Sequence, residues 1–359
     1  EVAAEGMGIE NGVHALVESD AGRFAAAVVA LYNDEALWSR LSANGQDLVR
    51  ERFGETANRK ALLRVLNDAR ALPIALWQGY CEGIEAVAVP APPAGADVDV
   101  SVIVPAFNKW ALTRTCIASV VAASAGAGVR FEIIIADDCS TDETADAGER
   151  LPGVRVVRTQ ANVGFLRNCN HAAGHAGGKY IVLLNNDTIV LPGWLDTLHA
   201  MMERDESIAI GGSKLLYPDG TIQEAGGGLL ASAEGVSIGR AFFEAGELRP
   251  ARRDEPVFDF ERETDYLTGA SIMVRVSFWQ QAGGFDEAFD TAYCEDADLA
   301  MQARASGRRA VYQPRSEVVH LEHQSYAEAG DARHLDLQRH NKALLQEKWR
   351  AVLARDHLP

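Results

Sequence analysis

Four apolar runs in the middle of the chain each end in polar residues that could do chemistry. The clearest run, Tyr180–Leu184, is followed directly by Asn185, Asn186 and Asp187. Ligands of open α/β sheets bind beyond the carboxyl ends of the strands, so a carboxylate in this position can contact a ligand. The alternative is an aspartate that only caps the turn after the strand. The other three runs are followed by Asn108, by Asp137 and Asp138, and by Asn162.

Glu295 and Asp296 form a second acidic group, at the predicted start of an amphipathic helix. A carboxyl group at a helix N-terminus has a lowered pKa, which predicts an ionised side chain. The alternative is a pair of acids that only stabilises the first helical turn. Asp298 lies further into this helix and is expected to face solvent or a structural arginine. Cys294 is not expected to be a nucleophile, because its acidic neighbours raise the pKa of the thiol.

Alternating strands and helices must position the first group of side chains. Strands are predicted at 102–104, in the run before Asp137, at 154–157 and at 180–184, with helical patterns at 113–122 and 164–176. This order and spacing predict an α/β fold with a mostly parallel sheet flanked by helices. Because the carboxyl ends of parallel strands meet at one edge of a sheet, the four sets of polar residues are expected to form one site.

The second half of the chain is less regular. Segments 211–228 and 234–259 carry many glycines and charges, which predicts loops over a cleft. Residues 326–359 are expected to form a C-terminal helical tail. Regular patterns predict strands at 266–274 and 310–312, a short helix at 278–282 and a terminal helix at about 331–353.

The length of 359 residues is sufficient for about two domains. In the first part, Ser19-Asp20 and Asn33-Asp34 are predicted helix caps, and a third helix is predicted from Thr56. The text AVPAPPAGADVD further on is rich in alanine, proline and glycine and predicts a linker. The expected organisation is a helical module at 1–70, a linker at 71–99 and the α/β domain at 100–325.

The composition limits the partners of the chain. A formal net charge of −17 argues against a nucleic-acid backbone, because phosphate binding needs a basic face. A nucleotide can still bind if a divalent cation neutralises its diphosphate. The sequence shows no apolar run of about 18 residues and no signal peptide. The five cysteines lack paired spacing, which argues against a disulfide framework or a zinc site and predicts a cytoplasmic location.

Two stretches of the chain resemble known families. The ordered motifs VSVIVPAFN, IIIADDCSTDET, NVGFLRNCN, LLNNDT, YLTGA, GGFDEAF, EDADL and VVH resemble those of family-2 glycosyltransferases, from about residue 100 to 325. This resemblance implies a Rossmann-like GT-A fold and transfer of a sugar from a nucleotide-sugar. The first 65 residues resemble the C-terminal tail of GT-B-fold glycosyltransferases. Since the two-lobed body of that fold is absent, residues 1–70 are expected to be a remnant without chemistry of its own.

The family resemblance also implies a nucleotide pocket. Gly164 would allow the loop over the nucleotide to approach closely. Arg167 would add positive charge near the phosphates, although it is explained nearly as well as a solvated surface arginine, and Asp137 is also explained as a helix cap. The residues implied for the pocket are Pro105, Phe107, Asn108, Asp137, Asp138, Asn162, Gly164, Arg167 and Asn186.

A divalent cation is implied as well, held by Asp187 and His320. Asn185 replaces the first acid of the family's Asp-x-Asp motif, so one carboxylate is left for Mn²⁺ or Mg²⁺, and diphosphate oxygens and water must complete the shell. An imidazole ligand favours Mn²⁺ somewhat over Mg²⁺. His323 is the rival of His320 for this role.

The resemblance assigns the general base to Asp296, which would deprotonate the acceptor hydroxyl during a single inverting displacement. Glu295 would orient the acceptor or Asp296. Thr268-Gly269-Ala270 would shape the acceptor side. The implied acceptor is a glycan or lipid-linked saccharide in bacterial surface polysaccharide assembly, and domains upstream could associate with other enzymes or with the inner face of the membrane.

Two other functions remain open. The replacement at Asn185 allows a catalytically silent nucleotide-sugar-binding module. A sugar-phosphate nucleotidyltransferase on a related sheet would need a loop rich in Gly, Arg or Lys after the first strand, and residues 104–110 have no such loop. A dinucleotide-binding domain is not expected, because no G-x-G-x-x-G motif follows that strand.

Overall fold

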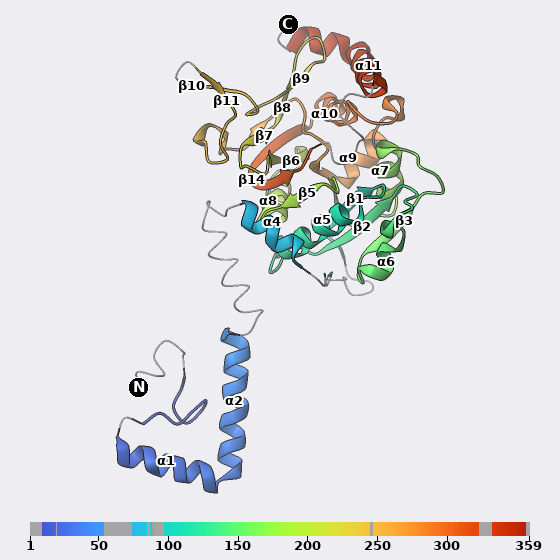
Figure 1. The fold of residues 1–359 in the computed structure, drawn as a ribbon. Helices are drawn as coiled ribbons and strands as arrows, with labels where there is room; N and C mark the ends of the chain where they lie inside the picture. The colour runs from blue at the N-terminus through green and yellow to red at the C-terminus, as the bar shows by residue number, and fades with distance from the viewer. Residues whose placement is uncertain are drawn as a thin grey trace. The chain divides into compact units, whose positions relative to one another are not determined.

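The computed structural model describes residues 9–18, 20–53, 74–84, 87, 89, 97–244, 247–322 and 332–356. The chain divides into two compact units, Glu1–Ala69 and Arg70–Pro359. The first unit contains helices α1 (Ala21–Asn33) and α2 (Glu35–Phe53) (Figure 1). Asp20 and Asp34 cap them as predicted, since each Oδ1 accepts a backbone N–H hydrogen bond at 2.9 Å. The helix predicted from Thr56 lies outside the described residues.

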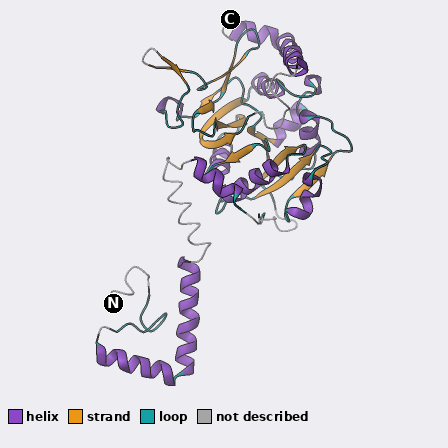
Figure 2. Cartoon of the chain, in the orientation of Figure 1, coloured by secondary structure: helices purple, strands orange, loops and turns teal. Residues whose placement is uncertain are grey.

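Within the described residues, the second unit is built on a ten-stranded sheet with helices on both faces (Figure 2). The main path runs β12-β14-β6-β13-β4-β1-β2-β3, with β5 beside β14 and β7 beside β6. Strands β4, β1, β2 and β3 are parallel, as predicted, whereas β13 runs antiparallel to both β4 and β6. The strands are β1 (Val100–Ala106), β2 (Phe131–Asp137), β3 (Arg155–Arg158), β4 (Tyr180–Leu184), β5 (Thr188–Val190), β6 (Ile208–Leu216), β7 (Ile222–Glu224), β12 (Arg262–Glu263), β13 (Ser271–Arg275) and β14 (Arg309–His320).

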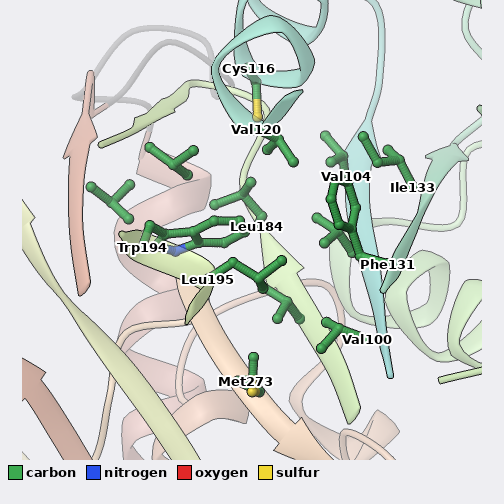
Figure 3. Close-up of a cluster of buried hydrophobic side chains, with 14 of the residues drawn as sticks. Val100, Val104, Cys116, Val120, Phe131, Ile133, Leu184, Trp194, Leu195 and Met273 are labelled. Carbon is green, nitrogen blue, oxygen red and sulfur yellow. The ribbon is translucent and has the colours of Figure 1, made fainter. Parts of the chain in front are cut away.

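Two helices, α5 (Trp110–Ala123) and α8 (Trp194–Arg204), cover one face of the sheet. Successive side chains of a strand point to opposite faces, so Val104 and Leu184 pack against these helices in a common core with Trp194 (Figure 3). The buried indole N–H of Trp194 donates a hydrogen bond to Ser271 Oγ at 3.0 Å, which satisfies its polar atom. The opposite face carries α7 (Phe165–Ala173), α9 (Val276–Ala282) and α10 (Glu295–Ala305) (Figure 1).

The sequence assigned 211–228 and 234–259 to loops, and the structure corrects this. β6 is a fully buried strand that pairs with β13 and β14. Its glycines are packing positions: a Cβ at Gly211 would lie 2.8 Å from Met201 Cε, and one at Gly212 would lie 2.5 Å from Leu267 Cδ2. Only glycine at these two positions leaves room for the side chains of Met201 and Leu267. The two segments also contain the short strands β7, β8 (Gly227–Leu229), β9 (Gly235–Ser237), β10 (Phe242–Glu244) and β11 (Glu247–Arg249).

The predicted linker 71–99 also needs correction, because residues 74–82 form helix α4 (Ile74–Glu82). Its apolar stripe of Ile74, Trp77 and Cys81 is buried, and the indole N–H of Trp77 donates a hydrogen bond to the Val190 carbonyl at 2.8 Å. This helix therefore belongs to the second unit. The spacing of Ile74, Trp77 and Cys81 is typical of a helix, whereas the proline-rich stretch that follows is typical of a linker.

The C-terminal part contains the predicted strand and the predicted helix, but their bounds differ from the prediction. β14 was predicted as 310–312 and spans Arg309–His320, so the motif ending in His320 is part of the strand. It pairs in parallel with β6 and antiparallel with β5. The predicted terminal helix is α11 (Ala332–Asp356). Among the described helices, none is long and apolar enough to span a membrane.

Candidate active site

A pocket of about 260 Å³ opens at the carboxyl ends of β1, β2 and β4. The register of the parallel strands explains its position, since Ala106 of β1 lies opposite Asp137 of β2. Six of the nine residues predicted to bind the nucleotide line this pocket: Pro105, Phe107, Asp138, Asn162, Gly164 and Asn186. The structure thus brings these six together where the sequence placed the site.

Asp138 is nearly fully buried and holds the loop that crosses the pocket. Its Oδ1 accepts hydrogen bonds from the backbone N of Val163 at 2.8 Å and from Thr159 Oγ1 at 3.0 Å. Its Oδ2 accepts one from the backbone N of Gly164 at 2.9 Å. Gly164 has a φ of +86°, and a Cβ there would lie 3.0 Å from the Thr291 side chain. Glycine is therefore needed at position 164, both for the positive φ and for the close approach of the backbone to Thr291.

Asp137 and Asn108 are not among the residues that line the pocket. The Asp137 carboxylate is fully buried, pairs with Arg158 and accepts a hydrogen bond from the backbone N of Ser140 at 2.9 Å. Asn108 Oδ1 accepts a hydrogen bond from the backbone N of Thr141 at 2.8 Å. Asn108 thus connects the loops after β1 and β2, and Asp137 connects the loop after β2 with the end of β3, so both side chains support the wall of the pocket from outside.

Arg167 also lies away from the pocket lining. Its guanidinium contacts the carboxylates of Glu287 and Asp290, each at 3.2 Å. The side chain remains 42% exposed. Its charge is thus partly compensated by two acids, which weakens the predicted role near the phosphates.

Asp187 and His320 lie side by side, although they are far apart in the sequence. Antiparallel pairing sets Thr188 of β5 opposite His320 of β14. His320 Nε2 is 3.3 Å from Asp187 Oδ1, and Nδ1 is 2.8 Å from Gln223 Oε1. Nδ1 thus faces the Gln223 side chain, and Nε2 faces the carboxylate. The rival His323 lies outside the part of the chain that the structure describes.

This arrangement fits a divalent cation as a pair of ligands. In the described residues, no group of three or more His, Cys, Asp or Glu side chains could hold a metal ion. Asp187 and the Nε2 of His320 supply one oxygen and one nitrogen donor. Further oxygens would have to come from a bound diphosphate and water, as the loss of the first acid of the motif predicted.

Asn185 and Asn186 connect this pair to the pocket, because both line it. Asn186 Nδ2 donates a hydrogen bond to Thr113 Oγ1 at 3.0 Å. Asn185 Oδ1 is buried and has no hydrogen-bond partner among the described residues. A buried acceptor without a partner costs stability, so it is a candidate for contact with a ligand.

The acidic pair lies at the N-terminus of α10, as predicted. Asp296 Oδ2 accepts a hydrogen bond from the backbone N of Gly269 at 3.0 Å, and Oδ1 accepts one from the backbone N of Ala297 at 2.7 Å. Glu295 is 6% exposed. Within the described part of the chain, its Oε2 has no hydrogen-bond partner.

The predicted lowering of the carboxyl pKa at this helix end is wrong. Burial raises the pKa of Asp296 in spite of the backbone N–H hydrogen bonds that lower it. Burial, followed by the neighbouring Asp296 carboxylate, raises the pKa of Glu295 to about 8. Desolvation of the charged form therefore outweighs the helix dipole. The same surroundings raise the pKa of the Cys294 thiol to about 12, as expected for a non-nucleophilic cysteine.

Two neighbouring residues of β7, Gln223 and Glu224, were missed by sequence reasoning. Gln223 orients His320, as described above. Buried Glu224 accepts hydrogen bonds from the backbone N of Thr268 at 3.0 Å and from Thr268 Oγ1 at 2.6 Å. Burial raises its pKa, and the Asp296 carboxylate adds to this. A three-residue strand inside a glycine-rich segment gives no periodic signal that could have identified either residue.

Direct contacts link the parts of the site. Asn185 of the pocket donates its backbone N–H to the Ala270 carbonyl at 3.0 Å, and the adjacent Gly269 donates to Asp296. On the other side, β7 supports both His320 and Thr268. The pocket, the Asp187–His320 pair and the acidic pair thus surround one edge of the sheet. Together they present a pocket of about 260 Å³, an imidazole beside a carboxylate, and two neighbouring carboxyl groups. Group transfer from a nucleotide diphosphate uses side chains of these kinds.

Comparison with known proteins shows the family of the chain. Residues 101–270 match the model of glycosyl transferase family 2. Over 218 residues, the chain is 30% identical to the N-acetylglucosaminyl-diphospho-decaprenol L-rhamnosyltransferase of Mycobacterium tuberculosis H37Rv, covering 56% of this chain and 70% of that enzyme. The chain therefore belongs to the family-2 glycosyltransferases, and the sequence prediction of the family is confirmed.

Two further comparisons agree with this assignment. The O-antigen biosynthesis protein RfbC of Myxococcus xanthus is 31% identical over 237 residues, which cover 65% of this chain and 18% of that protein. The solved structure of GalNAc-T7 with UDP, GalNAc and Mn²⁺ matches with a TM-score of 0.54 and 17% identity, over 72% of this chain and 50% of that one. This likeness shows the fold alone, and it confirms the predicted GT-A class.

Proposed function

We propose that this glycosyltransferase is an inverting enzyme. It transfers a sugar from a nucleotide-sugar to a hydroxyl group of a glycan or lipid-linked saccharide, in the assembly of a bacterial surface polysaccharide. The observation that carries the proposal is the position of Asp296. Its carboxylate accepts a hydrogen bond from the backbone N of Gly269, and the adjacent Ala270 carbonyl accepts one from Asn185, which lines the pocket.

The chemical step is a single displacement. The acceptor O–H proton passes to a carboxylate oxygen of Asp296 while the acceptor oxygen bonds to the anomeric carbon. The bond from that carbon to the diphosphate oxygen breaks on the opposite face, so the configuration inverts. The raised pKa of Asp296 makes it a stronger base than an ordinary carboxylate. Glu295 is largely protonated at neutral pH and can donate a hydrogen bond to the acceptor.

Asp187 and His320 would hold a divalent cation, with Gln223 orienting the imidazole. When bound, the cation compensates the negative charge of the leaving nucleotide diphosphate. The Mn²⁺ and UDP bound to GalNAc-T7 support a nucleotide-sugar with a divalent cation, and an imidazole ligand favours Mn²⁺. Asn185 and Asn186 line the adjacent pocket wall, where the nucleotide would lie.

The relatives guide the choice of substrates. The Mycobacterium relative is named as an L-rhamnosyltransferase acting on N-acetylglucosaminyl-diphospho-decaprenol, and the Myxococcus relative as an O-antigen biosynthesis protein. A first donor panel therefore includes nucleotide-activated L-rhamnose together with activated hexoses. Lipid-diphosphate-linked N-acetylglucosamine is the first acceptor.

The test measures free nucleoside diphosphate with Mn²⁺ present, for the full chain and for two matched variants. Asp296→Asn should bind the donor with unchanged affinity and lower the turnover by about 10²–10⁴-fold. Asp336→Asn, at a 73% exposed side chain, should keep wild-type turnover. Donor binding without turnover by the wild-type chain would instead support a silent binding module. Pyrophosphate release from a nucleoside triphosphate and a sugar phosphate would support a nucleotidyltransferase.

A further inference from the structure

The C-terminal helix α11 lies next to the segment that leads into the acidic pair (Figure 1). This helix and the acidic pair both lie beyond residue 270, where the match to the family model ends. We infer that α11 is a working part of the active site and that Asn341 is a positioning residue. It fixes loop 289–294, which contributes Thr291 to the pocket lining and leads into the acidic pair. The inference rests on the proposed function.

Asn341 holds the loop through its backbone. The side chain is fully buried, and its Nδ2 lies 3.1, 2.8 and 3.2 Å from the carbonyl oxygens of Phe289, Ala292 and Tyr293. These three acceptors bracket Thr291, which lines the pocket. One amide group thus reaches both sides of the pocket-lining residue.

The loop needs such support because its backbone is strained. Tyr293 and Cys294 have φ values of +77° and +72°, in the left-handed region that side chains with a Cβ rarely adopt. Such conformations persist only where the surrounding structure holds them. The next residue in the chain is Glu295. Any relaxation of the strained pair would therefore move the acidic group directly.

A second set of contacts fixes the helix that follows the loop. Asp298 of α10 was expected to face solvent or an arginine, but it is fully buried and contacts Lys348 and Trp349. Its Oδ1 accepts a hydrogen bond from the indole N–H of Trp349 at 2.7 Å, and its Oδ2 accepts one from Lys348 Nζ at 2.9 Å. Lys348 also reaches Asp286, before the loop, at 2.6 Å. Helix α11 therefore contacts the chain before, within and after the loop.

These contacts can affect the reaction without touching substrate. The carboxylate of Asp296 must approach the acceptor hydroxyl to within hydrogen-bond reach, and a misplacement of about 1 Å can cost about 100-fold in rate. Asn341 would act on Asp296 through the loop and α10. A purely structural role of α11 would change the stability of the fold and leave turnover per folded molecule unchanged.

The test compares three variants of the full chain. Asn341→Leu removes the amide donor at similar volume, and Trp349→Phe removes only the N–H donor to Asp298. Leu353→Ala is the control, because Leu353 is buried on the same helix and its apolar side chain has no hydrogen bond to donate. Each is measured for thermal midpoint, turnover with Mn²⁺, affinity for UDP, GDP and dTDP, and hydrogen exchange of residues 286–298.

Asn341→Leu should accelerate exchange in 289–294 and lower turnover at least tenfold, and Trp349→Phe should lower turnover about threefold or more. Leu353→Ala should lower the thermal midpoint and keep turnover within twofold. Wild-type turnover in both folded variants would overturn the inference, and so would an equal loss in the control. If Asn341→Leu does not fold, Trp349→Phe decides. A wild-type chain that binds nucleotide and transfers no sugar refutes the proposed function. In that case, hydrogen exchange of residues 286–298 and nucleotide affinity of the variants test the inference without turnover.

Discussion

The buried carboxyl group of Glu295 makes the stability of the second unit depend on pH. Burial and the Asp296 carboxylate raise its pKa from 4.5 to about 8. The unfolded chain releases this proton near pH 4.5, whereas the folded chain keeps it until about pH 8. The stability that the bound proton contributes is therefore complete below pH 4.5 and is lost as the pH rises through 8. The variant Glu295→Gln has no proton to release and should escape this loss.

The size of the effect follows from the two pKa values. Each pKa unit between the folded and unfolded states corresponds to about 1.4 kcal/mol. The interval from 4.5 to about 8 thus sets an upper limit of about 5 kcal/mol. Relative to Glu295→Gln, the wild-type chain should lose up to about 1.4 kcal/mol of unfolding free energy for each pH unit in this interval, and the difference should then stay constant at higher pH.

Urea unfolding at a series of pH values from about 5 to 9 measures this difference. The fluorescence of the buried Trp194 and Trp279 reports on the unit that contains Glu295. Glu347→Gln, at a 65% exposed side chain, is the matched control and should show no such slope. A difference between the wild-type chain and Glu295→Gln that stays constant over the whole range would refute the reasoning, because it would mean that Glu295 is ionised in the folded protein.

Three further outcomes follow from the site. His320→Ala removes one of the two proposed protein ligands, so the Mn²⁺ concentration for half-maximal turnover should rise about tenfold or more, which a metal titration measures. Gly164→Ala should lower the thermal midpoint and the affinity for nucleotide, because its methyl group meets Thr291. Gly126→Ala has the same φ of +86° with nothing within 4 Å and should change stability alone. Glu224→Leu leaves the backbone N–H of Thr268 unpaired, so the free energy of urea unfolding should fall by about 1–3 kcal/mol and turnover should fall as well. Unchanged turnover would mean that Glu224 does not support the acceptor side.

The parallel half of the sheet could be predicted from the sequence because its signals are local. Continuous apolar runs mark strands buried on both faces, and the polar residues after them fall at one edge by the geometry of parallel pairing. The pocket at Asp138, Gly164 and Asn186 follows from this rule. The proposed role of His320 rests on the likeness of the motifs, because no pattern in the sequence indicates it.

The rest depends on contacts between distant segments. Gly211 and Gly212 indicated a loop in the sequence, whereas in the fold they leave room for Met201 and Leu267. The pKa of Asp296 was predicted from the helix end alone, and burial by the surrounding chain reversed its direction. Sequence spacing cannot report how much water a side chain loses on folding.

The pairing of β14 with β5 has a consequence for biosynthesis. Asp187 leaves the ribosome early and His320 late, and they meet only when the last strand of the sheet has joined β5 and β6. Contacts between such distant segments close slowly. A nascent or partly assembled chain therefore lacks the complete Asp187–His320 pair, and the cation proposed for this pair would bind only molecules whose sheet is finished. Manganese or nucleotide added during refolding would draw the population toward that finished state by mass action.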